Sequence, residues 1–128
     1  MKMNSVQWGK FVGEAMLAML GNDPFRIAQA CGWQVIIEEQ DSLNYFLPRR
    51  VAVWEGDKRI IRIFSSALRR IFIDEQFGLR LVCSHEVFHG LHASGYKLCQ
   101  AISNPPPQLT RSEQEQAAEA FALTLLSA

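Results

Sequence analysis

The sequence lacks the features that identify several large classes of protein. Its three cysteines are odd in number and form no CxxC pair, which excludes a zinc-ribbon cysteine set and favours reduced thiols. Thirteen basic and thirteen acidic residues leave no net charge, whereas nucleic-acid-binding domains usually carry a basic excess. No apolar run reaches the roughly 18 residues of a membrane span, and Lys10 and Glu14 interrupt the run where a secretion signal would continue. We therefore expect a cytoplasmic protein without direct nucleic-acid or membrane contact.

The size and composition of the chain are those of one globular domain. Of its 128 residues, 48% are hydrophobic and 20% are charged. A chain of this length buries roughly two-thirds of its unfolded surface, so it can fold without disulfides or a structural metal. We expect a single domain over residues 1–128, in which any metal ion would serve function.

Helices are predicted at both ends of the chain by apolar spacing and capping residues. Residues 5–20 have helical periodicity, and Asp23–Pro24 begins a short second helix that Gly32 ends. Asp74 is a suitable N-cap for a long helix that ends near Gly95. A capping box at residues 110–113 opens the last helix.

The middle of the chain is rich in β-forming residues. Strands are expected at residues 33–38, 51–54 and 59–64, with a hairpin turn at 55–58. Residues 66–73 fit either a helix or one more strand at 71–73, and both remain open. Connections are expected at residues 39–48 and at the proline-containing segment 101–109.

The segment SHEVFH at residues 84–89 contains the motif HExxH within a helical pattern. His85 and His89 lie four residues apart, so both imidazoles face one side of the helix and can bind one ion. Glu86 can reach a metal-bound water without being a ligand, and it would act as the base. The pattern predicts a catalytic Zn²⁺ site; the alternative is a helix that carries two histidines by coincidence.

A third ligand is needed, and the last helix offers carboxylates. Glu115 shares an edge of the apolar stripe formed by Ala118 and Ala122, where a carboxylate is costly unless it is paired or metal-bound. We therefore expect Glu115 as the third ligand. Glu119, one turn later, would accept the free N–H of a ligand histidine. The alternative for both glutamates is an exposed acidic helix face.

His92 lies close to the motif but does not fit as a ligand. It would lie about 10.5 Å from His85 along a continuous helix, too far for one ion to bind both well. We expect His92 to line the cleft or to be an ordinary residue at the helix end. His92 and Tyr96 are also candidates to donate a hydrogen bond to the transition state.

Three segments together resemble the ImmA/IrrE family of small intracellular metallopeptidases. They are DPFRIAQACGWQVI at 23–36, RLVCSHEVFHGLH at 80–92 and EQAAEAFALTLL at 115–126. The resemblance implies that His85, His89 and Glu115 bind zinc and that Glu86 is the base. It also implies a protein substrate, namely a helix-turn-helix repressor that controls phage, mobile-element or stress genes.

The sequence departs from the family pattern at three points. Phe88 replaces a small glycine and would narrow the cleft or reposition the helix, Glu119 stands where Asn or Asp is usual, and the sequence ends where relatives generally continue. Two alternatives to a peptidase therefore stay open. One is a binding module that sequesters a regulator or toxin partner with a vestigial or structural metal site. The other is a short HExxH hydrolase with a non-peptide or DNA-associated substrate.

The expected fold class is α+β. A small sheet of three or four strands would pack on the HExxH helix, and the C-terminal helix would supply Glu115. An N-terminal helical pair would cover the remaining surfaces. An edge strand beside the zinc helix could bind an extended segment of the substrate by strand addition.

Overall fold

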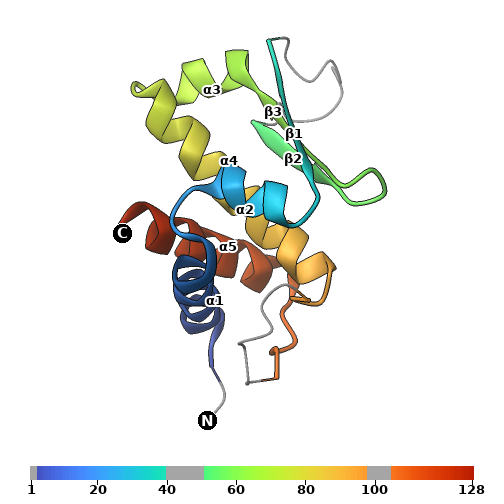
Figure 1. Ribbon diagram of the computed structural model, residues 1–128. Coiled ribbons are helices and arrows are strands. Elements are labelled where there is room, and N and C mark those ends of the chain that lie inside the picture. Colours follow the sequence, from blue (N-terminus) through green and yellow to red (C-terminus); the bar gives the residue numbers. More distant parts are fainter. Residues whose placement is uncertain (1–2, 40–50, 98–104) are drawn as a thin grey trace.

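The computed structural model describes residues 3–39, 51–97 and 105–128, and within these ranges the chain is α+β (Figure 1). It contains five helices and a three-stranded mixed sheet. In chain order the elements are α1 (Ser5–Leu20), α2 (Pro24–Ala30), β1 (Gln34–Glu38), β2 (Ala52–Glu55), β3 (Ile60–Phe64), α3 (Ser65–Ile71), α4 (Glu75–Ala93) and α5 (Arg111–Leu126).

The predicted helix starts are confirmed by side-chain caps. The Asp23 carboxylate accepts a hydrogen bond from the backbone N–H of Phe25, and Asp74 accepts one from Phe77. At α5, the Thr110 hydroxyl and the Glu113 side chain each bond the other's backbone N–H, which completes the capping box. These caps satisfy N–H groups that have no partner within the helix, and they set where each helix begins.

The sheet has the order β1-β3-β2, so β3 is central. It pairs parallel with β1 and antiparallel with β2, the latter through the predicted hairpin. Ile61 and Ile63 are buried on the face of β3 that the helices cover. On the other face, Arg62 forms ion pairs with Glu38 of β1 and Glu55 of β2 and so bridges all three strands.

Residues 66–73 do not supply a fourth strand. Helix α3 covers residues up to Ile71 and buries Ala67 and Leu68. The hydroxyl of Ser65 donates to the carbonyl of Glu38 and ties the start of this helix to the end of β1. Of the two expected connections, residues 40–48 and 101–104 lie outside the described residues, and residues 105–109 have no regular structure.

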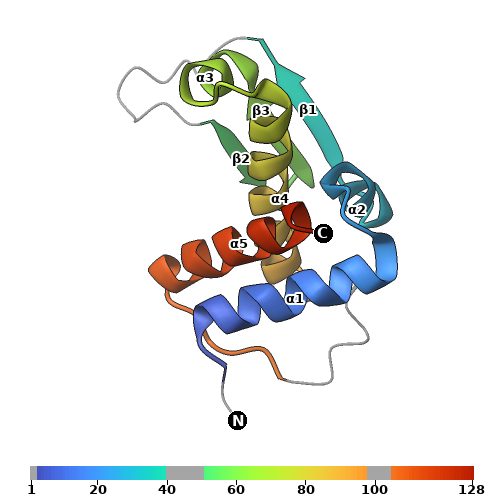
Figure 2. The same cartoon turned by 90° about the vertical axis from the view of Figure 1, so that its left-hand side faces the viewer.

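Helix α4 occupies the centre of the molecule. It contacts β2 and β3 on one side and α5 on another, and α2 and α3 also pack against it. Helix α1 lies along α5, and Figure 2 shows both crossing in front of α4. The fully buried large side chains come from all of these elements except β2; they are Trp8, Val12, Met16, Ile27, Ile61, Ile63, Leu68, Val87, Phe88, Leu91, Phe121 and Leu125.

Phe88 belongs to this core and does not narrow a cleft. Its side chain is 0% exposed, and its ring lies 5.7 Å from that of Phe121 on α5. It also lies against His92 and Tyr96. Phe88 therefore lies on the buried side of α4. Within the described ranges, none of the helices has both the length and the apolar composition that a bilayer span demands.

Helices α1 and α5 approach closely at two glycines. A Cβ atom at Gly9 would lie 2.9 Å from the Cα of Ala117 and nearer still to its carbonyl oxygen, and one at Gly13 would lie 2.9 Å from the Cβ of Thr124. The atoms near Gly9 belong to the backbone of α5, so they can yield only if a helix moves. The absence of a side chain at Gly9 is thus a condition for the contact between α1 and α5.

We predict that Gly9→Ala destabilises the protein by about 1–3 kcal/mol, because the added methyl overpacks the helix contact. Helix propensity alone would act in the opposite direction by up to about 1 kcal/mol. Urea unfolding followed by circular dichroism measures the difference, with Lys10→Ala at the exposed neighbouring position as the control. A more stable Gly9→Ala variant would contradict this close approach.

Candidate metal centre

Two imidazoles of α4 point to one place. His85 and His89 are one helical turn apart on a helix that the Asp74 cap and its packing hold in register. Their side chains are 28% and 18% exposed, and their Nε2 atoms are 3.2 Å apart. Both histidines therefore present the same ring nitrogen at the surface of the helix.

Glu115 comes to the same place from the first turns of α5. Its Oε2 lies 2.8 Å from Nε2 of His85, and its Oε1 lies 2.9 Å from Nε2 of His89. The side chain is 57% exposed, so it lies less deeply than its position beside the apolar stripe suggests. The carboxylate reaches over the edge of α5 to the two imidazoles.

These three groups are compatible with a metal site. One ligand atom from each residue lies within 4.8 Å of the other two. Ligand atoms about 2.0–2.1 Å from a tetrahedrally bound ion lie roughly 3.3 Å apart, close to the separation of the two Nε2 atoms. The donor set, two imidazole nitrogens and a carboxylate, suits several divalent transition metals and by itself does not select one.

The electrostatic environment favours imidazoles that can bind a metal. Burial lowers the pKa of His89 from its ordinary value, and the negative charge of Glu115 acts in the opposite direction. Burial also lowers the pKa of His92. A lowered pKa favours the neutral ring of His89, which is the form that coordinates a cation.

The candidate metal centre opens into a polar cleft of about 490 Å³. Helix α4 contributes His85, Glu86, His89 and His92 to its lining. The opposite walls come from strand β2 and from the start of α5; they comprise Ala52, Val53 and Trp54, and Arg111, Gln114 and Glu115. The HExxH glutamate and all three candidate ligands thus face one cleft.

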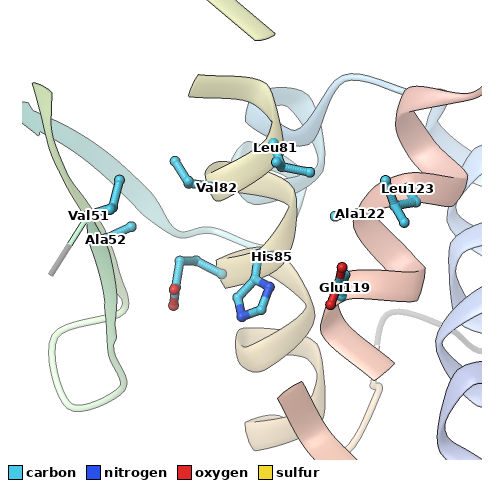
Figure 3. Close-up of a pocket in the computed structure, with 9 residues that line it drawn as sticks. Val51, Ala52, Leu81, Val82, His85, Glu119, Ala122 and Leu123 are labelled. Atoms are coloured by element: carbon cyan, nitrogen blue, oxygen red, sulfur yellow. The ribbon is translucent and has the colours of Figure 1, made fainter. Parts of the chain in front are cut away.

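A second, largely apolar pocket of about 420 Å³ adjoins the same centre. His85 and Glu86 line both spaces, so the two are neighbours on this part of α4. Figure 3 shows the pocket between the β2 end of the sheet, α4 and α5. Its apolar walls are Val51, Ala52, Leu81, Val82, Ala122 and Leu123.

The remaining predicted site residues lie in three different places. Glu119 is exposed and lines the apolar pocket, where Figure 3 shows it across from His85; no described hydrogen bond joins it to His85 or His89. His92 lines the polar cleft. Tyr96 is 6% exposed, and its hydroxyl interacts with Trp8 and with His92.

Sequence reasoning missed two contributions to the cleft. Arg111 is four residues before Glu115, a spacing that places both on one face of a helix, and this signal could have identified it. The sequence pattern places Trp54 only in a strand, and its position beside α4 depends on how the sheet packs.

Comparisons with protein-family models, with curated proteins and with solved structures found no match to this chain.

We predict that the protein binds one divalent ion and that Glu115→Ala weakens this binding by at least about 100-fold. Removal of a residue that only hydrogen-bonds to a metal ligand lowers metal affinity by about 10–100-fold, and Glu115 would itself contribute a ligand atom. Metal content of the purified protein and competition with a chromophoric chelator measure the effect. Glu119→Ala, one turn further along the same helix, is the matched control and should bind metal as the unmodified protein does. Equal losses in the two variants would exclude the three-residue site.

Proposed function

We propose that this protein is a zinc-dependent endopeptidase. The observation that carries the proposal is the meeting of His85 and His89 from one helix with the carboxylate of Glu115 from another, beside Glu86 in the same cleft. Structural zinc sites usually have four protein ligands, whereas three ligands and a nearby carboxylate are typical of hydrolytic sites. In the described residues the cluster has three members.

The chemistry assigned to the chain's own residues is proton transfer. A bound Zn²⁺ would lower the pKa of a coordinated water to about 7 and polarise the scissile carbonyl. Glu86 accepts the proton of the attacking water and passes it to the departing amide nitrogen. His85, His89 and Glu115 would hold the ion, and all three line the polar cleft.

The position of strand β2 favours a peptide as the substrate. It is an edge of the sheet among the described strands, because it pairs with β3 alone. Ala52, Val53 and Trp54 also form one wall of the polar cleft. An extended segment added along β2 would run past the candidate metal centre, with main-chain hydrogen bonds holding it in place.

The substrate class follows from the resemblance of the three motif segments to ImmA/IrrE peptidases. We propose a helix-turn-helix repressor that is cut in an extended segment. The second candidate function is a binding module for a regulator or toxin partner. The observation that favours it is the exposure of the Glu115 side chain. Chelation distinguishes the two, since it stops cleavage by a peptidase but leaves partner binding by such a module unchanged.

We predict that Glu86→Gln retains the metal and loses cleavage by about 10²–10⁴-fold or more, because the general base is removed while the ligands remain. The assay incubates purified protein with the product of an adjacent repressor-like gene and with a mixed peptide library, followed by mass spectrometry. Glu119→Gln serves as the control for the loss of one acidic group near the site. Undiminished cleavage by the Glu86→Gln variant would refute the assigned mechanism.

The apolar pocket predicts a preference for a large apolar side chain next to the cut bond. We expect Leu123→Asp, which places a charge at its half-exposed wall, to lower kcat/KM for such peptides by at least about tenfold. Val6→Asp makes the same change at an exposed residue of α1 outside the pocket and should have no effect. Cleavage rates for peptides that differ only at one residue provide the measurement.

A further inference from the structure

A third hollow, which we call the basic pocket, lies beyond the polar cleft. Its volume is about 360 Å³, and none of the three candidate metal ligands lines it. Its walls come from the segment before β1, from the hairpin between β2 and β3, and from the C-terminal end of α4 with the turn that follows. The lining includes Trp33, Trp54, Gly56, Arg59, Ala93 and Lys97.

The charge of the basic pocket is positive. Arg59 lines it from the hairpin and Lys97 lines it from the turn after α4, and no acidic side chain of the described residues belongs to its lining. In residues 3–39, 51–97 and 105–128 neither cation forms an ion pair, whereas Arg62 and Arg69 each pair with two glutamates. Two cations beside one hollow favour an anionic occupant.

The turn geometry does not account for an arginine at position 59. Its φ is 55°, in the left-handed region where glycine, asparagine and aspartate are more common. Its backbone N–H donates to the carbonyl of Gly56 and closes the turn, which any residue with this backbone conformation could do. The side chain of Arg59 is exposed and lines the basic pocket.

Two indoles form the apolar part of the basic pocket. The rings of Trp33 and Trp54 have centroids 4.8 Å apart and planes inclined by 56°. Trp33 packs against α4, where a Cβ atom at Gly90 would lie 2.6 Å from its ring. A Cβ atom at Gly56 would lie 3.4 Å from Nε1 of Trp54, so the N–H edge of this indole borders Gly56. An indole N–H can only donate, and it suits a carboxylate oxygen.

The apolar pocket, the polar cleft and the basic pocket follow one another in the same order along β2 and along α4. On β2, Ala52 lines the apolar pocket and the cleft, and Trp54 lines the cleft and the basic pocket. On α4, Leu81 lines the apolar pocket, and Ala93 lines the cleft and the basic pocket. The cleft with the candidate metal centre therefore lies between the other two.

We propose that the basic pocket binds an acidic side chain of the substrate, and that this side chain and the one in the apolar pocket flank the cut bond. At a rise of about 3.3 Å per residue, Ala52 and Trp54 are about 7 Å apart, and Val51 and Gly56 are up to about 17 Å apart. An extended substrate beside β2 has the same rise, so its apolar and acidic residues would be about two to five positions apart. The assignment to a substrate rests on the proposed peptidase function.

The basic pocket lies away from the bond that is cut, so it stabilises the enzyme–substrate complex and the transition state alike. Its effect is therefore expected in KM more than in kcat. Arg59 and Lys97 are both exposed, and two exposed ion pairs together contribute a factor of about 2–30, which salt reduces.

The first test compares peptides that the zinc-loaded, full-length protein cuts. They are acetylated and amidated, share one leucine, and differ only in a glutamate, glutamine or lysine placed two to five residues from it. We expect kcat/KM to be about tenfold higher with glutamate than with glutamine at the best separation, mainly through KM, and lowest with lysine. The difference should shrink when salt is raised from about 50 mM to about 500 mM.

Substitutions that remove one charge locate this preference. Arg59→Asn removes the guanidinium and keeps a residue that suits the left-handed turn, and Lys97→Gln removes the other cation. Each should lower the preference for glutamate by about threefold, and the double variant should abolish it. Lys58→Gln is the matched control, because Lys58 is an exposed cation of the same turn that does not line the basic pocket.

Several outcomes overturn the inference and leave the peptidase intact. One is equal cleavage of the glutamate and glutamine peptides at every separation. Another is a preference for glutamate that survives in the double variant or is lost equally in Lys58→Gln. A third uses peptides with a free carboxyl terminus: if these are preferred over their amides while internal glutamate has no effect, the pocket binds the chain end.

Absence of cleavage by the zinc-loaded protein would count against the peptidase, and binding then tests the basic pocket. The probes are fluorescein-labelled forms of the glutamate and glutamine peptides, measured by fluorescence anisotropy. Binding of the glutamate peptide about tenfold tighter, lost in the double variant and kept in Lys58→Gln, would support an acidic-peptide site without cleavage. Equal binding of the two peptides would overturn the site.

Discussion

The candidate metal centre depends on the packing of α5 across α4. The rings of Phe88 on α4 and Phe121 on α5, both fully buried, join the two helices. Helix α1 covers the other side of α5 and holds it in place. Its glycines allow the two helices to approach closely. The polar groups of the candidate metal centre lie beside this apolar contact between the helices. The free energy gained by burying the apolar side chains offsets the cost of holding a carboxylate against two imidazoles.

The buried residues of α4 pack against and position the residues that α4 presents to the cleft. Residues three or four positions apart share a face of a helix, so His85, His89 and His92 all line the cleft, while Phe88 lies on the buried face. The ring of Phe88 is stacked on the ring of His92. Trp8, on a helix far away in the sequence, donates a hydrogen bond to the Tyr96 hydroxyl, which also lies within hydrogen-bond distance of His92. The geometry of the cleft is therefore connected to the same core that stabilises the fold.

Local sequence patterns predicted the helices and strands well where one interaction of short range decides the outcome. Asp23, Asp74 and Thr110 cap their helices as expected, since each cap involves residues at most three positions apart. Residues 66–73 were ambiguous because their apolar residues suit both a helix and a strand, and only the burial of Ala67 and Leu68 in the assembled chain favours the helix. The burial of Phe88 could not be predicted either, because it depends on which face α5 covers.

The sequence by itself determined that His85 and His89 share a helix face beside Glu86, because a spacing of four residues fixes this in any α-helix. It also favoured Glu115 among the acidic residues of the last helix. Only the tertiary structure decided that Glu115 reaches both imidazoles and that Tyr96 turns into the core. It also placed an apolar pocket next to the candidate metal centre. These relations join residues that are far apart in the chain or depend on which surfaces become buried, and such relations arise from the packing of whole elements.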